Sequence, residues 1–171
     1  KIKYLTLSDE NYKSVAFDPR IDISFDENAK ILVVQDSGIG MNEEDLTANL
    51  GTIARSGTKA FIEALENEAK KDSALIGQFG VGFYSAFMAA SKIDVITKKA
   101  GTEKVFKWTS NGTNSYDLEE LSIDSEESKK YGFDKEGTHG SSIVMSLNDE
   151  STEYASRWKV EDLIKKYSDH I

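Results

Sequence analysis

The chain has 171 residues, of which 39% are hydrophobic and 30% charged, with a formal net charge of −9 and no cysteine. This length supports one domain with a buried core. The missing cysteines exclude disulfides and thiolate zinc sites, and favour a reducing, cytoplasmic compartment. The acidic balance argues against a nucleic-acid partner, which needs clustered Lys and Arg, and no apolar run of about eighteen residues indicates a membrane partner. The two histidines, His139 and His170, are far apart and predict surface positions, with no metal site.

The first residues predict that the chain is a piece of a longer protein. It opens at Lys1, without Met and without the apolar stretch of a signal peptide. Residues 1–7 have helical apolar spacing, typical of the end of a truncated helix. Residues 20–25 then alternate apolar and polar side chains, and residues 30–35 return as a more buried strand after an Asp-Glu-Asn turn. We expect an antiparallel hairpin here.

Directly after this hairpin comes the first glycine motif, Asp36-Ser37-Gly38-Ile39-Gly40-Met41. A carboxylate at a strand end offers a fixed hydrogen-bond acceptor to an amine-bearing base, and a loop of glycines leaves room beside it. Taken alone the motif is weak evidence, because Asp and Gly are also the usual turn residues. Asn42 follows as the predicted N-cap of a helix whose first turn is acidic.

A second glycine motif, Gly77-Gln78-Phe79-Gly80-Val81-Gly82-Phe83, opens a predicted helix over residues 82–90. A helix start presents free N–H groups and a partial positive charge to phosphates. The order of the glycines is the reverse of the dinucleotide fingerprint, and no Gly-Lys pair exists to form a P-loop. The alternative is that these glycines only permit tight helix packing. Between the two motifs, residues 49–73 combine glycines with short polar side chains, which suits a segment that moves, and include a predicted helix over 59–71.

The rest of the chain predicts strands, a polar surface segment and a final amphipathic helix. The strands are expected over residues 92–98, 104–108, 115–118 and 141–147, the polar segment over 124–135 and the helix over 160–167. Grouped antiparallel strands with interspersed helices favour an α+β two-layer sandwich over βαβ winding.

Three blocks of this sequence resemble the N-terminal ATP-binding domain of the heat-shock protein 90 chaperones. They are the first glycine motif, the stretch Leu50-Gly51-Thr52-Ile53-Ala54-Arg55-Ser56-Gly57-Thr58, and the second motif extended over residues 76–85. The resemblance covers residues 1–171, and the short region 98–141 is more similar to the bacterial type. It implies one nucleotide-binding domain with the two-layer sandwich (Bergerat fold) shared with gyrase, mismatch-repair and histidine-kinase ATPases. It also implies a lid over about residues 49–72.

The resemblance implies which residues contact ATP or ADP. Asp36 resembles the carboxylate that accepts a hydrogen bond from the adenine amino group, and a hydroxyl beside it resembles the one that shares a water with the base. Counting back from Leu147, the predicted strand end, selects Ser141 for this hydroxyl, with Thr138 as the second choice. The remaining implied contacts are with the base (Gly40, Met41), near the ribose and α-phosphate (Asn49), on the lid (Arg55, where the family usually has Lys) and with the phosphates (Gly80, Val81, Gly82, Phe83).

In the heat-shock protein 90 family, the glutamate that activates water and the asparagine that holds Mg²⁺ lie on a helix before the position of Lys1. The resemblance therefore implies no catalytic residue and no metal ligand in this sequence, and negligible ATP hydrolysis by it alone. For the full protein it implies an ATP-dependent chaperone that assists the folding of client proteins and forms a homodimer. Two alternatives stay open: an ATPase of the same fold but of the gyrase or mismatch-repair type, and a nucleotide-sensing domain that does not hydrolyse ATP.

Overall fold

The computed structural model describes residues 12–13, 15, 18–51, 82–113 and 115–168. Within them, strands of one antiparallel sheet lie in the order β1-β2-β6-β3-β4-β5. The strands are β1 (Ile21–Asp26), β2 (Ile31–Asp36), β3 (Ala90–Lys98), β4 (Val105–Ser110), β5 (Asp117–Leu121) and β6 (Gly140–Leu147). The helices are α2 (Glu43–Leu46), a π-helical turn (Thr47–Gly51), α6 (Gly82–Ala89), α7 (Glu126–Lys130), a 3₁₀ helix (Asp149–Ala155) and α8 (Arg157–Tyr167).

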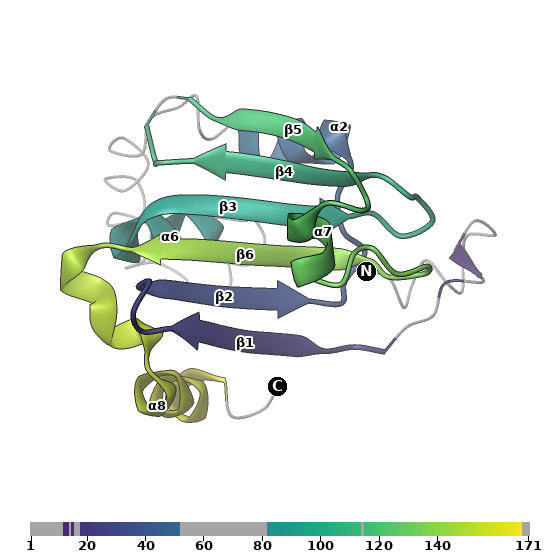
Figure 1. Ribbon diagram of the computed structural model, residues 1–171. Helices are drawn as coiled ribbons and strands as arrows, with labels where there is room; N and C mark the ends of the chain where they lie inside the picture. The colour runs from purple at the N-terminus through teal and green to yellow at the C-terminus, as the bar shows by residue number, and fades with distance from the viewer. Residues whose placement is uncertain (1–11, 14, 16–17, 52–81, 114, 169–171) are drawn as a thin grey trace, which may run out of the picture.

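The sheet has helices on both of its faces. In Figure 1, α7 lies in front of the sheet, α2 and α6 lie behind it, and α8 lies beyond the β1 edge. We call the side of α2 and α6 the helix face and the other side the α7 face. This arrangement of one antiparallel sheet with interspersed helices confirms the α+β class. None of the helices in the described part of the chain combines the length and the apolar composition needed to span a bilayer.

Each face of the sheet has its own core, because successive residues of a strand point to opposite faces. On the helix face, Ile93, Val95 and Trp108 are at most 1% exposed and belong to one cluster. On the α7 face, Ile96 and Phe133 belong to a second cluster. The last six residues of β3 are therefore all buried, and its odd-numbered residues there point toward the helix face.

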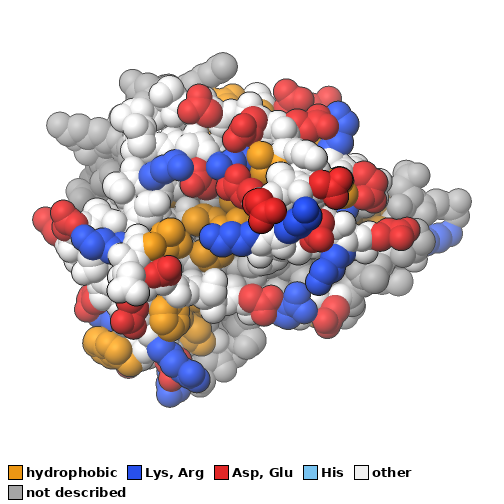
Figure 2. All heavy atoms as spheres, in the orientation of Figure 1, with side chains coloured by type: hydrophobic (Ala, Val, Ile, Leu, Met, Phe, Trp, Pro, Cys, Tyr) orange, Lys and Arg blue, Asp and Glu red, His pale blue; other side chains and the backbone are white. Residues whose placement is uncertain are grey.

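The α7 face carries charges of both signs. In Figure 2, which is viewed from this side, Lys and Arg side chains alternate with Asp and Glu around hydrophobic side chains near the middle of the face. Because the signs are mixed, the described residues of this face do not form the continuous basic surface that nucleic-acid binding requires.

Most elements predicted from the sequence are present, with small shifts of their bounds. The hairpin is β1 and β2, each displaced by one residue from the predicted range. β5 starts at Asp117 instead of residue 115, and α8 starts at Arg157 instead of residue 160. The 3₁₀ helix Asp149–Ala155 has no counterpart in the prediction. The helices predicted over 1–7 and 59–71 lie outside the described residues.

Candidate functional site

Three polar side chains lie in a row where β2, β6 and β3 end side by side. Asp36 is in register with Ser141, and Ser141 is in register with Thr97. Residues directly opposite each other in an antiparallel sheet point to the same face, here the helix face. The row is compact, since the Thr97 and Ser141 hydroxyl oxygens are 3.0 Å apart. Thr97 is fully buried and Ser141 is 7% exposed.

The hydrogen bonds of Thr97 fix the direction of the bonds in this row. Its Oγ1 accepts from the Met41 N–H at 2.9 Å and donates its single proton to the Gly140 carbonyl at 2.8 Å. The Ser141 hydroxyl must therefore be the donor in its contact with Thr97. This leaves the lone pairs of Ser141 to accept from a water or a ligand beside Asp36.

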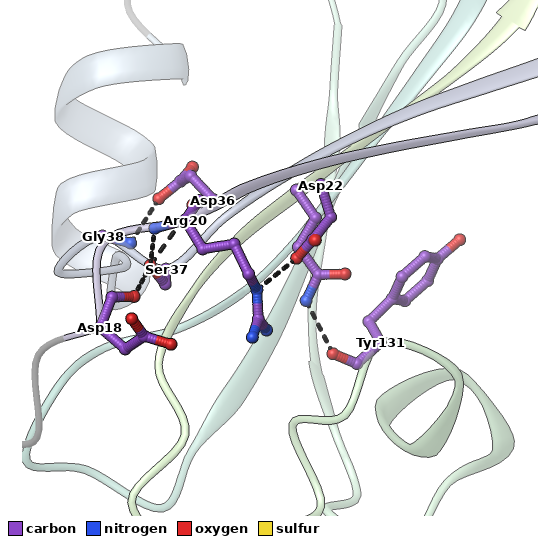
Figure 3. A network of polar contacts seen from close by, with 8 residues as sticks. Asp18, Arg20, Asp22, Asp36, Ser37, Gly38 and Tyr131 are labelled. Atoms are coloured by element: carbon purple, nitrogen blue, oxygen red, sulfur yellow. Dashed lines mark hydrogen bonds and ion pairs between the residues drawn. The ribbon is translucent and has the colours of Figure 1, made fainter. Parts of the chain in front are cut away.

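Asp36 is held as a fixed acceptor. Its Oδ1 accepts from the Gly38 N–H at 2.7 Å, which closes a tight turn directly after β2. Partial burial raises the pKa of Asp36, while the Gly38 N–H and the nearby charge of His139 act in the opposite direction. In Figure 3 its carboxylate points away from the guanidinium of Arg20. A half-buried carboxylate in this position is suited to accept a hydrogen bond from an amine-bearing heterocycle.

Two glycines allow the loop to pack against the strand ends. Gly40 has φ +68°, and a Cβ there would lie 1.9 Å from the Lys98 carbonyl oxygen. Gly140 has φ +132°, and a Cβ there would lie 2.0 Å from the Asp36 carbonyl oxygen. Only glycine fits either position. Gly40 of the first motif is thus required by close backbone packing, whether or not a ligand is bound.

Asn42 caps the helix that follows the first motif, as the sequence predicts. Its side chain accepts from the Asp45 N–H, and the Asp45 side chain accepts from the Asn42 N–H, which completes a capping box. The α-helical part α2 is short and continues directly into the π-helical turn, where Asn49 is exposed. The Tyr84 hydroxyl of α6 donates to the Leu50 carbonyl at 2.9 Å and so joins α6 to this turn.

Helix α6 begins at Gly82, in the second glycine motif. The ring of Phe83 packs edge-on against Trp108 with centroids 5.8 Å apart, so its side chain belongs to the core of the helix face. Met41 also packs against that core. Both side chains are half-buried against this core, and the Met41 N–H is already bonded to Thr97.

The structure brings together part of the residue set predicted from the sequence. Asp36, Gly40, Met41 and Ser141 lie at or directly after the adjacent ends of β2 and β6, and Thr97 of β3 is an addition that the sequence analysis missed. Thr138, the second choice for the hydroxyl, instead donates to the Lys135 carbonyl at 2.7 Å in a surface turn. The predicted residues Arg55, Gly80 and Val81 lie outside the described residues, as does the predicted lid beyond Gly51.

A cavity of about 280 Å³ lies beside the first motif, on the α7 face of the sheet. It is lined by Arg20 and Asp22 on the β1 side, by Gln35 of β2, and by Tyr131 and His139 of the segment before β6. The Gln35 amide donates to the Tyr131 carbonyl at 2.9 Å across this space (Figure 3). Asp36 also contributes to its wall. Asp36 is therefore shared by the cavity and the row of polar side chains, whereas Ser141 and Thr97 do not line the cavity.

His139 departs from the expected surface position. It is half-buried, and its Nδ1 lies 2.6 Å from the Gly38 carbonyl oxygen. His170 lies outside the described residues. In the described part of the chain, His, Asp and Glu form no group of three or more that could hold a metal ion.

Comparison with known proteins shows the family of this chain. A family model described as "Histidine kinase-, DNA gyrase B-, and HSP90-like ATPase" matches residues 12–138. The chain belongs to this ATPase family. The match confirms the fold class that the resemblance implied, and with it the ATP-binding domain type.

The chain is also similar to curated relatives over all of its given residues. It is 61% identical to "Chaperone protein HtpG" of Treponema denticola, 57% identical to that of Treponema pallidum and 55% identical to that of Wolinella succinogenes. Each similarity covers 100% of this chain and 26% of the relative. The chain thus spans about a quarter of the length of these relatives, and the identities confirm the resemblance to heat-shock protein 90 chaperones.

Proposed function

We propose that this chain is the ATP-binding domain of an ATP-dependent molecular chaperone. The observation that carries the proposal is the fixed Asp36 acceptor at the end of β2, aligned with the hydroxyls of Ser141 and Thr97 on the two neighbouring strands. An acceptor beside a hydroxyl that can hold a water suits the adenine edge, which presents an amino group next to a ring nitrogen. The whole-chain similarity to chaperones, with no comparable feature pointing to DNA, favours this reading over a gyrase or mismatch-repair role.

Each residue of the proposed site has a role that its chemistry allows. Asp36 accepts from the adenine amino group, and Ser141 accepts from a water shared with the base. Gly40 and Met41 are the neighbouring contacts to the base. Four further groups complete the proposal by family resemblance: Asn49 near the ribose and α-phosphate, Arg55 on a lid over about 49–72, the helix start Gly80-Val81-Gly82-Phe83 at the phosphates, and Mg²⁺ bound with the nucleotide.

In the full protein, ATP binding would close the lid, promote dimerisation and drive the release or refolding of client proteins, with hydrolysis resetting the cycle. We place this activity in the cytoplasm. The family resemblance assigns neither the water-activating glutamate nor the Mg²⁺ ligand to any residue of this sequence. We therefore infer that residues 1–171 form a nucleotide-binding domain that binds ATP and ADP but hydrolyses ATP negligibly by itself.

Isothermal titration calorimetry with ADP tests the site. Asp36→Asn replaces a charged acceptor with an amide, and losing a charge-assisted hydrogen bond of roughly 1.5–3 kcal/mol weakens binding about tenfold to a hundredfold. Asp22→Asn is the matched control, because it removes the same charge from the neighbouring strand but lines the cavity on the α7 face. Its ADP affinity should equal that of the wild type. Equal affinities of all three proteins would reject the pocket assignment.

A further inference from the structure

His139, directly before β6, contacts the loop that follows Asp36 at the end of β2. The two residues in contact, His139 and Gly38, are 101 positions apart in the sequence, and the Nδ1 to carbonyl distance is 2.6 Å. A carbonyl oxygen only accepts hydrogen bonds, so Nδ1 must carry the proton in this contact. The imidazole is therefore a donor to the loop in both its neutral and its protonated form.

Gly38 is bonded on both of its sides. Its N–H donates to Asp36 Oδ1 at 2.7 Å, and its carbonyl accepts from His139. The residue before it, Ser37, is fixed from the other direction, because its hydroxyl accepts from the Arg20 N–H at 2.8 Å and donates to the Asp18 carbonyl at 2.6 Å. Ser37 thus ties the loop to the segment before β1, and His139 ties it to β6.

The contact matters because Gly38 has no side chain to hold it. A Cβ at this position would lie 2.5 Å from Asp36 Oδ1, so a larger residue would push the carboxylate away. Glycine in turn leaves the backbone free to rotate. The orientation of the Gly38 N–H, and with it the direction of the Asp36 carboxylate, then depends on what holds the Gly38 carbonyl.

Charge supports the same arrangement. A positive charge on His139 favours the ionised form of Asp36 and opposes the effect of burial on its pKa. The charged side chains that share the cavity wall with His139 are Asp18, Arg20, Asp22 and Lys135, in addition to Asp36. These charges are of both signs and nearly balance. The geometry of the Gly38 contact therefore has more influence on Asp36 than the net charge around it.

We propose that His139 is a positioning residue for base recognition: by holding the Gly38 carbonyl, it keeps Asp36 aimed at a base that carries an exocyclic amine. This inference rests on the proposed nucleotide site. It predicts that His139 affects selectivity between bases, and not merely overall affinity. Inosine diphosphate is the informative probe, because it presents a carbonyl oxygen where ADP has the amino group.

The experiment compares ADP and inosine diphosphate by calorimetry on matched variants. His139→Leu removes the donor, and His139→Asn keeps an amide N–H near the position of Nδ1. We expect His139→Leu to lose about threefold to tenfold in ADP affinity, the effect of one hydrogen bond, while inosine diphosphate binding changes less. The preference for ADP should therefore fall, and His139→Asn should restore most of it. Thr138→Val, which breaks a neighbouring bond to Lys135 away from the loop, should leave the preference unchanged.

Results that would overturn the proposal differ from results that would overturn the proposed function. If His139→Leu weakens both nucleotides equally and His139→Asn does not restore the preference, the residue has only a structural role. If His139→Leu does not fold, His139→Gln takes its place, because its amide reaches the Nε2 position and should also lower the preference. An unchanged preference in His139→Gln would then overturn the proposal. If the wild type binds neither nucleotide, or Asp36→Asn binds ADP normally, the proposed function itself fails.

Discussion

Substituting Gly40 by Ala tests whether the first motif is shaped by backbone packing. The new Cβ would lie 1.9 Å from the Lys98 carbonyl oxygen, and 3.4 Å is the start of ordinary contact, so the loop would have to move by about 1.5 Å. The three nearest atoms, which are the carbonyl oxygen and carbon of Lys98 and the Cα of Lys99, all belong to the backbone, so no side-chain rotation relieves the conflict. The movement would break the bonds from Ala100 N–H to the Ile39 carbonyl at 2.7 Å and from Met41 N–H to Thr97 at 2.9 Å.

The free energy follows from these two effects. The left-handed backbone costs an L-residue about 1–2 kcal/mol, and two lost hydrogen bonds cost about 1–3 kcal/mol together. Gly101→Ala is the matched control, because Gly101 has φ +79° but nothing within 4 Å of its Cβ position. It should show the backbone cost alone. The extra cost in Gly40→Ala corresponds to a melting temperature lower than that of Gly101→Ala by roughly 2–12 °C for a chain of this size.

Differential scanning calorimetry of both variants measures this difference directly. Equal melting temperatures for Gly40→Ala and Gly101→Ala would refute the reasoning, since they would show that the close approach to Lys98 costs nothing. A Gly40→Ala protein that melts lower and also loses ADP binding would agree with a loop whose packing and binding geometry are the same feature.

Three further results are expected. Thr97→Val removes the hydroxyl that bonds to the backbones of Met41 and Gly140. It should lower the free energy of unfolding by about 1–3 kcal/mol, because these backbone groups lose their partner. An unchanged urea midpoint would contradict this. Asp36→Asn should stabilise the nucleotide-free protein at pH 7, because burial raises the pKa of Asp36 and the folded state therefore resists its ionisation. This gain should shrink as the pH falls toward the ordinary value of 3.8, and a gain that grows in acid would have the wrong sign. Finally, phosphate release from ATP by residues 1–171 should not exceed the uncatalysed rate, and measurable turnover abolished by a substitution in this chain would show that the base lies within it.

Local signals explain why much of the fold is predictable. Residues 20–25 alternate apolar and polar side chains, and an apolar run follows them. A hairpin is enough to place the apolar side chains of both segments on one face of the sheet, and β1 and β2 form that hairpin. Asn42 is recognisable because a capping box involves residues three apart, Asn42 and Asp45. For the hairpin and the cap, the information lies within a few residues of the feature. Ser141 differs, because the family resemblance implies the hydroxyl and the count back from Leu147 only locates it.

The contacts that the sequence does not reveal are long-range. Thr97 joins the polar row only because β3 pairs with β6 in one register, and a shift by one residue would turn it to the α7 face. His139 reaches Gly38 because β2 and β6 end side by side, whereas in the sequence it has no nearby histidine or cysteine and predicts only a surface position. Neither β3 nor β6 carries a sequence pattern that specifies its partner strand. Alternation in β3, where Ile93, Val95 and Thr97 share a face, could have placed Thr97 on the correct side but not beside Ser141.

Lys98 is the clearest case of a residue whose role depends on the tertiary structure. By type it predicts an exposed strand end, yet its side chain is 1% exposed. Its Nζ donates to Glu103 at 3.0 Å and to the carbonyls of Phe133 and Lys135 at 3.4 Å each. The buried cation thus holds the segment before β6 against the sheet, a function that composition and periodicity cannot indicate.

A structure of the protein with ADP tests the central claim most directly. We expect the adenine amino nitrogen within about 2.7–3.2 Å of the Asp36 carboxylate, on the helix face and beside the Ser141 hydroxyl. ADP bound instead in the cavity on the α7 face, between Arg20 and Tyr131, would contradict it.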